Sequence, residues 1–158
     1  MVTISLCMIV KNEERVLGRC LESVQEIADE IIIVDTGSED RTKEIAEKYH
    51  ARVFEQEWQD DFSRARNYSF SHAEMDYCMW LDADDIITKS EALKLKRWKE
   101  ETDESSDVIM LRYVAGFDEK RNPTLVYYRE RIVKRDKDFQ WQGRVHEAIA
   151  VRGRTEYL

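Results

Sequence analysis

The chain has 158 residues, of which 42% are hydrophobic and 37% are charged, and its formal net charge is −8 at pH 7. This apolar content, with 4 Trp, 7 Tyr and 5 Phe, excludes a disordered chain, and the length predicts one domain over residues 1–158. The acidic balance argues against a general nucleic-acid-binding protein, which needs a basic surface.

The first 87 residues alternate short apolar runs with amphipathic stretches. Four runs predict strands, at Ile4–Val10, Ile31–Val34, Arg52–Phe54 and Tyr77–Leu81. Helices are expected between them, one capped by Asn12, one around Arg41–Tyr49 and one near Phe62–Ala73. This alternation predicts parallel pairing through right-handed crossovers, and therefore an α/β fold with helices on both faces of a mostly parallel sheet.

The second part, residues 88–158, is less regular. A helix is expected near Ser90–Lys99, followed by strands at Val108–Tyr113, Leu125–Arg129 and Val145–Val151. Because Asn122-Pro123 marks a turn between the first two of these strands, the sequence predicts that this part is small and antiparallel.

The acidic segment Asp82-Ala83-Asp84-Asp85 directly follows an apolar strand. Alternate residues leaving a strand project to the same side, so Asp82 and Asp84 can share one divalent cation. Such a cation can stabilise a leaving diphosphate. The alternative is a solvated acidic turn that caps the next helix.

A second carboxylate, Asp35, follows the second predicted strand. It can accept a hydrogen bond from a nucleotide base, and Gly37 lets the backbone turn sharply beside it. The alternative is that Asp35 and Ser38 cap the next helix.

Three further side chains are candidates for chemistry. Arg66 could bind a base or a phosphate as a planar donor, although a surface position is the alternative. His146 could supply a third metal ligand or act as a base beside Glu147, or it could be structural. The sequence contains no Walker A motif, no GxGxxG and no GxSxG, so P-loop, dinucleotide and α/β-hydrolase chemistries lack their residues.

The cysteines Cys7, Cys20 and Cys78 lie in apolar stretches with no CxxC spacing, which indicates core residues in a reducing compartment. The apolar run Thr3–Val10 follows no basic segment and is too short for a signal core or a membrane span. We therefore expect a soluble cytoplasmic protein without a transmembrane segment.

Taken together, four blocks of the sequence resemble family 2 glycosyltransferases of the GT-A fold. The blocks are ISLCMIVKNEERVLGRCLES at 4–23, IIIVDTGSEDRTKEIAEKY at 31–49, DDFSRARNYSF at 60–70 and YCMWLDADDII at 77–87. The segment FQWQGRVHEAI at 139–149 is similar to the bacterial branch whose catalytic domain often precedes helical repeats. The resemblance implies a GT-A type, Rossmann-like nucleotide-diphospho-sugar transferase fold, with a donor half at 1–87 and an acceptor half at 88–158.

The resemblance also implies roles for individual residues. The nucleotide-sugar would be bound by Ile9, Val10, Asn12, Glu13, Asp35, Arg66, Asp82 and Ala83, with Lys11 in the same loop. Mn²⁺ or Mg²⁺ would be held by Asp82, Asp84 and His146, and the catalytic residues would be Asp84 and the base Glu147.

The implied function is metal-dependent transfer of a sugar, with inversion, from a nucleotide diphosphate donor, expected to be a UDP-sugar, to an unknown saccharide, peptide or lipid-linked acceptor. Two features depart from the family: Thr36 replaces a second acid after the second strand, and the chain stops at Leu158. The alternatives are a non-catalytic or truncated sugar-nucleotide-binding domain, and a fragment that self-associates or meets a missing C-terminal region. A phosphohydrolase with Asp82 as nucleophile is disfavoured, because in such enzymes the motif follows an early strand.

Overall fold

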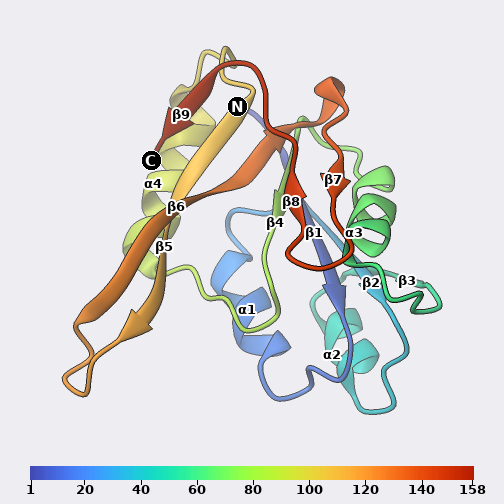
Figure 1. Ribbon diagram of the computed structural model, residues 1–158. Coiled ribbons are helices and arrows are strands. Elements are labelled where there is room, and N and C mark those ends of the chain that lie inside the picture. The colour runs from blue at the N-terminus through green and yellow to red at the C-terminus, as the bar shows by residue number, and fades with distance from the viewer.

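The computed structural model describes residues 1–158 and contains nine strands in two sheets (Figure 1). The strands are β1 Ile4–Val10, β2 Glu30–Asp35, β3 Arg52–Glu55, β4 Tyr77–Trp80, β5 Val108–Phe117, β6 Pro123–Lys134, β7 Trp141–Gln142, β8 Ala148–Ile149 and β9 Thr155–Tyr157. The large sheet has the order β3-β2-β1-β4-β6-β5-β9, and β7 and β8 form the small sheet. Strands β1 to β4 pair in parallel, whereas β6 is antiparallel to both β4 and β5. The predicted α/β architecture, with its antiparallel C-terminal part, is confirmed.

Four α-helices and a short 3-10 helix pack on this sheet. They are α1 Leu17–Val24, α2 Thr42–Lys48, α3 Phe62–Ser71, α4 Lys89–Glu101 and the 3-10 turn Arg135–Lys137. Side chains alternate across a strand, so β1 contributes Leu6 and Met8 to a core shared with α1, α2 and α4, and Cys7 to a second core. The second core packs on the other face with Trp141 and Ile149 of the small sheet, beside α3 (Figure 1). Both faces of the central strands are therefore covered, as their continuous apolar runs predict.

The predicted helix after Asn12 begins later than expected. Helix α1 starts at Leu17, its N-cap residue is Val16, and no side chain caps it. Asn12 instead takes a left-handed conformation with φ of 53°. The prediction that Asn12 caps this helix is wrong, because the side chain bonds to another loop, described below.

The strands of the second part also differ from their predicted bounds. Strands β5 and β6 extend well past Val108–Tyr113 and Leu125–Arg129 and form a long hairpin that projects from the sheet at the lower left of Figure 1. The predicted strand Val145–Val151 is wrong except for β8, because the preceding residues Gly143 and Arg144 bond to α3 and Glu147 bonds to Arg66 of the same helix.

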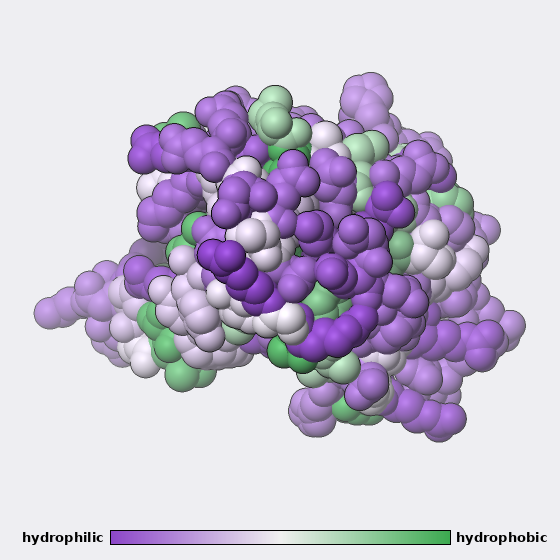
Figure 2. Space-filling view, turned by 90° about the horizontal axis from the view of Figure 1, so that it is seen from above, coloured by the Kyte–Doolittle hydropathy of each residue, from purple (hydrophilic) through white to green (hydrophobic).

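None of the helices has the length and apolar content that a membrane crossing requires. Seen from above the view of Figure 1, the surface is largely hydrophilic, with small separate apolar areas (Figure 2). The hydrophobic residues of the central strands are thus used in the two cores rather than displayed on this face.

Candidate functional site

The loops that carry the predicted donor-site residues meet at the carboxyl edge of the parallel strands. Val10 and Asp35 are the last residues of β1 and β2, and they are register partners in the sheet. The backbone N–H of Thr36 donates to the carbonyl of Val10 at 3.0 Å, which ties the two strand ends together. Ile9 is partly exposed at this edge, whereas Val10 is buried. Open α/β sheets bind ligands at such carboxyl ends.

Asp35 is buried, with 2% of its surface exposed, and one of its carboxylate oxygens has no partner. Its Oδ1 accepts from the backbone N–H groups of Gly37 at 3.0 Å and Ser38 at 2.8 Å. Gly37 has φ of 115°, a conformation that glycine adopts without strain and that the turn requires. Its Oδ2 is buried without a hydrogen bond. A buried acceptor left unpaired is costly, so a ligand donor that reaches Oδ2 would be bound favourably.

Asn12 joins the loop after β1 to the loop after β2. Its backbone N–H donates to Ser38 Oγ at 2.9 Å, and its Oδ1 accepts from the backbone N–H of Glu39 at 2.8 Å. The backbone N–H of Glu13 donates to Thr42 Oγ1 at 2.8 Å in the same way. These reciprocal bonds place the segment that resembles the family's nucleotide loop directly beside Asp35.

The acidic loop, residues 81–85, leaves β4 next to these two loops. The Asp82 side chain is 48% exposed, Asp84 is exposed, and Ala83 is buried. The carbonyl of Asp82 accepts a weak bond from the Cys20 thiol at 3.6 Å, and burial raises the pKa of that thiol to about 12. The loop therefore presents two carboxylates outwards, while its middle residue packs inwards.

Arg66 lies beneath the acidic loop rather than on the surface. Its Nη2 donates to Asp82 Oδ1 at 2.7 Å and its Nε donates to Glu147 Oε1 at 2.8 Å. The guanidinium carbon is 4.9 Å from the ring centroid of Trp80 and 4.7 Å from that of Trp141. The guanidinium thus bonds to two predicted site carboxylates that lie far apart in the sequence. Its contact with a base or a phosphate stays a prediction.

The C-terminal segment reaches the site through α3. The backbone N–H of Phe62 donates to the carbonyl of Arg144 at 3.0 Å, and Ser63 Oγ donates to that of Gly143. The Glu147 side chain is only 14% exposed and faces Arg66, whereas His146 is exposed with φ of 56°. Of the predicted pair, the structure brings Glu147 and not His146 into the hydrogen-bonded network.

The predicted metal ligands Asp82, Asp84 and His146 are not gathered into one group. No three His, Cys, Asp or Glu side chains come together closely enough to hold a metal ion. Burial, followed by the charges of Asp84, Asp40 and Asp82, raises the pKa of Glu13, which shows that these carboxylates lie near one another. Carboxylate oxygens suit Mg²⁺ and Mn²⁺, and Mg²⁺ is commonly held by one or two carboxylates together with substrate phosphates. The carboxylates of the acidic loop are ligands of the type that such a cation takes, and His146 is exposed, so its role as a third ligand stays a prediction.

Two residues that the sequence did not single out also belong to the site. Asp85 Oδ2 accepts from the backbone N–H of Asp82 at 2.8 Å and from Arg131 Nη1 at 3.0 Å. Arg131 lies on β6, beyond the end of the predicted strand Leu125–Arg129, so its side of the hairpin could not be assigned from the sequence. The signal in the sequence was a basic residue directly before two β-branched apolar residues (ERIV, 130–133).

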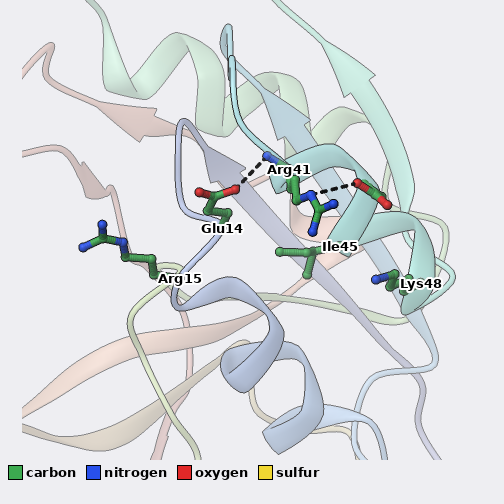
Figure 3. A pocket seen from close by; sticks show the side chains of 6 residues that line it. Glu14, Arg15, Arg41, Ile45 and Lys48 are labelled. Carbon is green, nitrogen blue, oxygen red and sulfur yellow. Dashed lines mark hydrogen bonds and ion pairs between the residues drawn. The ribbon is translucent and has the colours of Figure 1, made fainter.

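A pocket lies between the segment after β1 and helix α2 (Figure 3). It is lined by Glu14, Arg15, Arg41, Glu44, Ile45 and Lys48. The backbone N–H of Arg41 donates to Glu14 Oε2 at 3.1 Å across it. None of the predicted site residues lines this pocket, so it is separate from the candidate site.

The sequence profile of Glycosyl transferase family 2 matches residues 5–152. A TPR repeat-containing protein of Synechococcus elongatus is 37% identical over 150 residues, which cover 94% of this chain and 36% of that protein. The SPbeta prophage-derived glycosyltransferase SunS of Bacillus subtilis is 28% identical over 148 residues, 92% of this chain and 34% of SunS. The chain thus spans about a third of the length of these two relatives.

Solved structures share the fold. TarS 1–349 of S. aureus in complex with UDP-GlcNAc aligns with a TM-score of 0.72 at 18% identity, covering 99% of this chain and 56% of the TarS 1–349 chain. Glucosyl-3-phosphoglycerate synthase of Mycobacterium tuberculosis in complex with UDP aligns with a TM-score of 0.58 at 22% identity, covering 73% of this chain and 45% of the synthase chain. These comparisons confirm the predicted family and fold class.

Proposed function

This chain belongs to glycosyl transferase family 2, and we propose that it binds a UDP-sugar together with a divalent cation and transfers the sugar to an acceptor. The observation that carries the proposal is the unpaired, buried Oδ2 of Asp35 at the joined ends of β1 and β2. Uracil carries an imide N–H, the kind of donor this oxygen needs. The UDP and UDP-GlcNAc complexes of proteins with this fold support the choice of base.

The acidic loop supplies the second part of the proposed site. Asp82 and Asp84 would hold Mn²⁺ or Mg²⁺ against the diphosphate, and a bound cation would stabilise the negative charge of the departing UDP. Arg66 orients Asp82 through its 2.7 Å bond, so one carboxylate oxygen of Asp82 is fixed and the other remains for ligand. Because the Asp82 side chain is 48% exposed, it remains accessible while it is held.

Glu147 is our candidate for the general base. Its Oε1 is engaged by Arg66, and a carboxylate has a second oxygen that can accept the proton of an acceptor hydroxyl or amine. Attack by that acceptor on the face of the sugar opposite the diphosphate would invert the anomeric centre. The alternative function is a domain that binds the nucleotide-sugar without transferring it.

Thermal unfolding with UDP, GDP and TDP, each with and without Mn²⁺, tests the donor site. At a hundredfold excess over its dissociation constant a ligand adds about 2.7 kcal/mol to stability, which corresponds to a midpoint rise of roughly 5–10 °C for a domain of this size. We expect a Mn²⁺-dependent rise with UDP. Binding of UDP without transfer from a UDP-sugar would favour the non-catalytic alternative.

Asp35→Asn is the matching variant. The amide keeps an oxygen for Gly37 and Ser38 but can place an N–H against the base, so the variant should fold and lose most of the UDP-induced rise. Asp136→Asn, at an exposed residue of the 3-10 helix, is the control and should keep it. An unchanged rise in Asp35→Asn, or no rise with any nucleotide in the unaltered protein, would refute the proposed donor site.

A further inference from the structure

The β5–β6 hairpin places a buried arginine beside the acidic loop. Arg131 is 4% exposed and lies on β6, which pairs with β4 through the residues next to it in sequence. A buried guanidinium is costly unless its charge and its N–H groups are compensated. The groups that bond to the Arg131 guanidinium therefore indicate the role of this residue.

All the polar partners of Arg131 belong to β4 or to the loop that follows it. Its Nη1 donates to Asp85 Oδ2 at 3.0 Å and lies 3.5 Å from the carbonyl of Trp80. Its guanidinium carbon is 4.0 Å from the ring centroid of Trp80 and 4.9 Å from that of Tyr113 on β5. The planar group is thus fixed by an ion pair and by two aromatic rings.

Asp85 connects Arg131 to the backbone of the acidic loop. The same Oδ2 accepts from the backbone N–H of Asp82 at 2.8 Å, and the backbone N–H of Asp85 donates to the carbonyl of Asp82 at 3.0 Å. The Asp85 side chain is 11% exposed, against 48% for Asp82. Within one acidic segment, the inward carboxylate of Asp85 closes the turn, whereas the side chains of Asp82 and Asp84 are more exposed.

We propose that Arg131 and Asp85 are positioning residues that fix the acidic loop so that Asp82 and Asp84 face a cation and the diphosphate. This inference rests on the proposed function. It makes the β5–β6 hairpin part of the donor site, although the hairpin contributes no residue that resembles the family's donor motifs. Loosening the hairpin's hold on the loop should weaken the cation-dependent part of nucleotide binding and leave the base contact at Asp35 intact.

Calorimetric titration with UDP, in Mn²⁺ and in EDTA, tests the proposal on three variants. Arg131→Met removes the charge, Arg131→Lys keeps the charge but loses the planar group, and Asp85→Asn weakens the ion pair. Loss of an outer partner of metal-binding residues commonly costs 10–100-fold in metal affinity, so the Mn²⁺-dependent gain in UDP affinity should fall at least about tenfold in Arg131→Met. UDP affinity in EDTA should stay at the wild-type value. In Arg131→Lys the Mn²⁺-dependent gain should lie between that of the unaltered protein and that of Arg131→Met.

Arg112→Met is the control, since Arg112 is an exposed arginine of the same hairpin and should bind like the unaltered protein. If Arg131→Met does not fold, as judged by circular dichroism, Arg131→Lys and Asp85→Asn decide the question. Folded variants that keep the full Mn²⁺-dependent gain would overturn the positioning role, as would equal UDP affinity of the unaltered protein with and without Mn²⁺. Absence of any UDP binding by the unaltered protein would overturn the proposed function itself, and this inference with it.

Discussion

Replacing Arg66 with Met tests whether the buried bridge between α3, the acidic loop and the C-terminal segment stabilises the fold. Removing one partner of a buried ion pair costs roughly 3–5 kcal/mol, and that range applies to the bond with the 14% exposed Glu147. The Asp82 side chain is 48% exposed, so its bond with Arg66 contributes less than about 1 kcal/mol to stability. The contacts with Trp80 and Trp141 add about 0.5–2 kcal/mol each, of which the methionine recovers a part. We expect a net loss of at least about 3 kcal/mol.

Urea and thermal unfolding, followed by circular dichroism, measure this loss. For a domain of 158 residues, about 3 kcal/mol corresponds to a midpoint lower by roughly 6–12 °C. Arg64→Met is the matched control, because Arg64 lies on the same helix with an exposed side chain and should change stability by less than about 0.5 kcal/mol. If Arg66→Met unfolds at the same midpoint as Arg64→Met, the bridge contributes nothing to stability and the reasoning fails.

Two further predictions concern carboxylates with opposite roles. Asp84→Asn should abolish the Mn²⁺-dependent part of UDP binding and of transfer, yet change stability by less than about 0.5 kcal/mol because Asp84 is exposed; turnover like the unaltered protein would remove Asp84 from the metal site. Hydrogen bonds from the side chain and backbone of Thr3 lower the pKa of Asp76 below its ordinary 3.8. The ionised Asp76 therefore stabilises the fold above that value, and this stabilisation is lost as the pH falls through the lower pKa of the folded state. Urea unfolding between about pH 5 and pH 2 should therefore show a shallower acid loss in Asp76→Asn than in the unaltered protein, and parallel losses would contradict this.

The strands of the first half could be predicted because their signals are local. Continuous apolar runs gave β1 with its observed bounds and placed β2, β3 and β4 within two residues at each end. The predicted start of the first helix was wrong because the Asn12 side chain could either cap the helix or bond to another loop. It accepts from the backbone N–H of Glu39, 27 residues away, and does not cap the helix. Local propensity cannot rank such alternatives, since the competing partner is distant in sequence.

The C-terminal part was harder because tertiary contacts determine its conformation. The backbone of Trp141 exchanges two hydrogen bonds with the Asn67 side chain, at 2.7 Å and 3.0 Å, which fixes the two-residue strand β7 against α3. The run Val145–Val151 favours a strand, but the carbonyls of Gly143 and Arg144 just before it bond to α3, and Glu147 within it bonds to Arg66 of α3. The same contacts bring Glu147 to Arg66 across 81 residues, and no periodicity in the sequence encodes that meeting.

The carboxylates of the acidic loop indicated a charged site from the sequence alone, whereas the arginines that bond to them could not be predicted. Two buried arginines, Arg66 and Arg131, neutralise only part of a group of five carboxylates, which are Glu13, Asp82, Asp84, Asp85 and Glu147. The raised pKa of Glu13 reflects burial together with the charges that remain near it, chiefly that of Asp84. A diphosphate approaching this excess of negative charge would be repelled unless a cation came with it. Under the proposed function, nucleotide and metal bind jointly, so removing the metal should weaken UDP binding more than losing any single contact to the base.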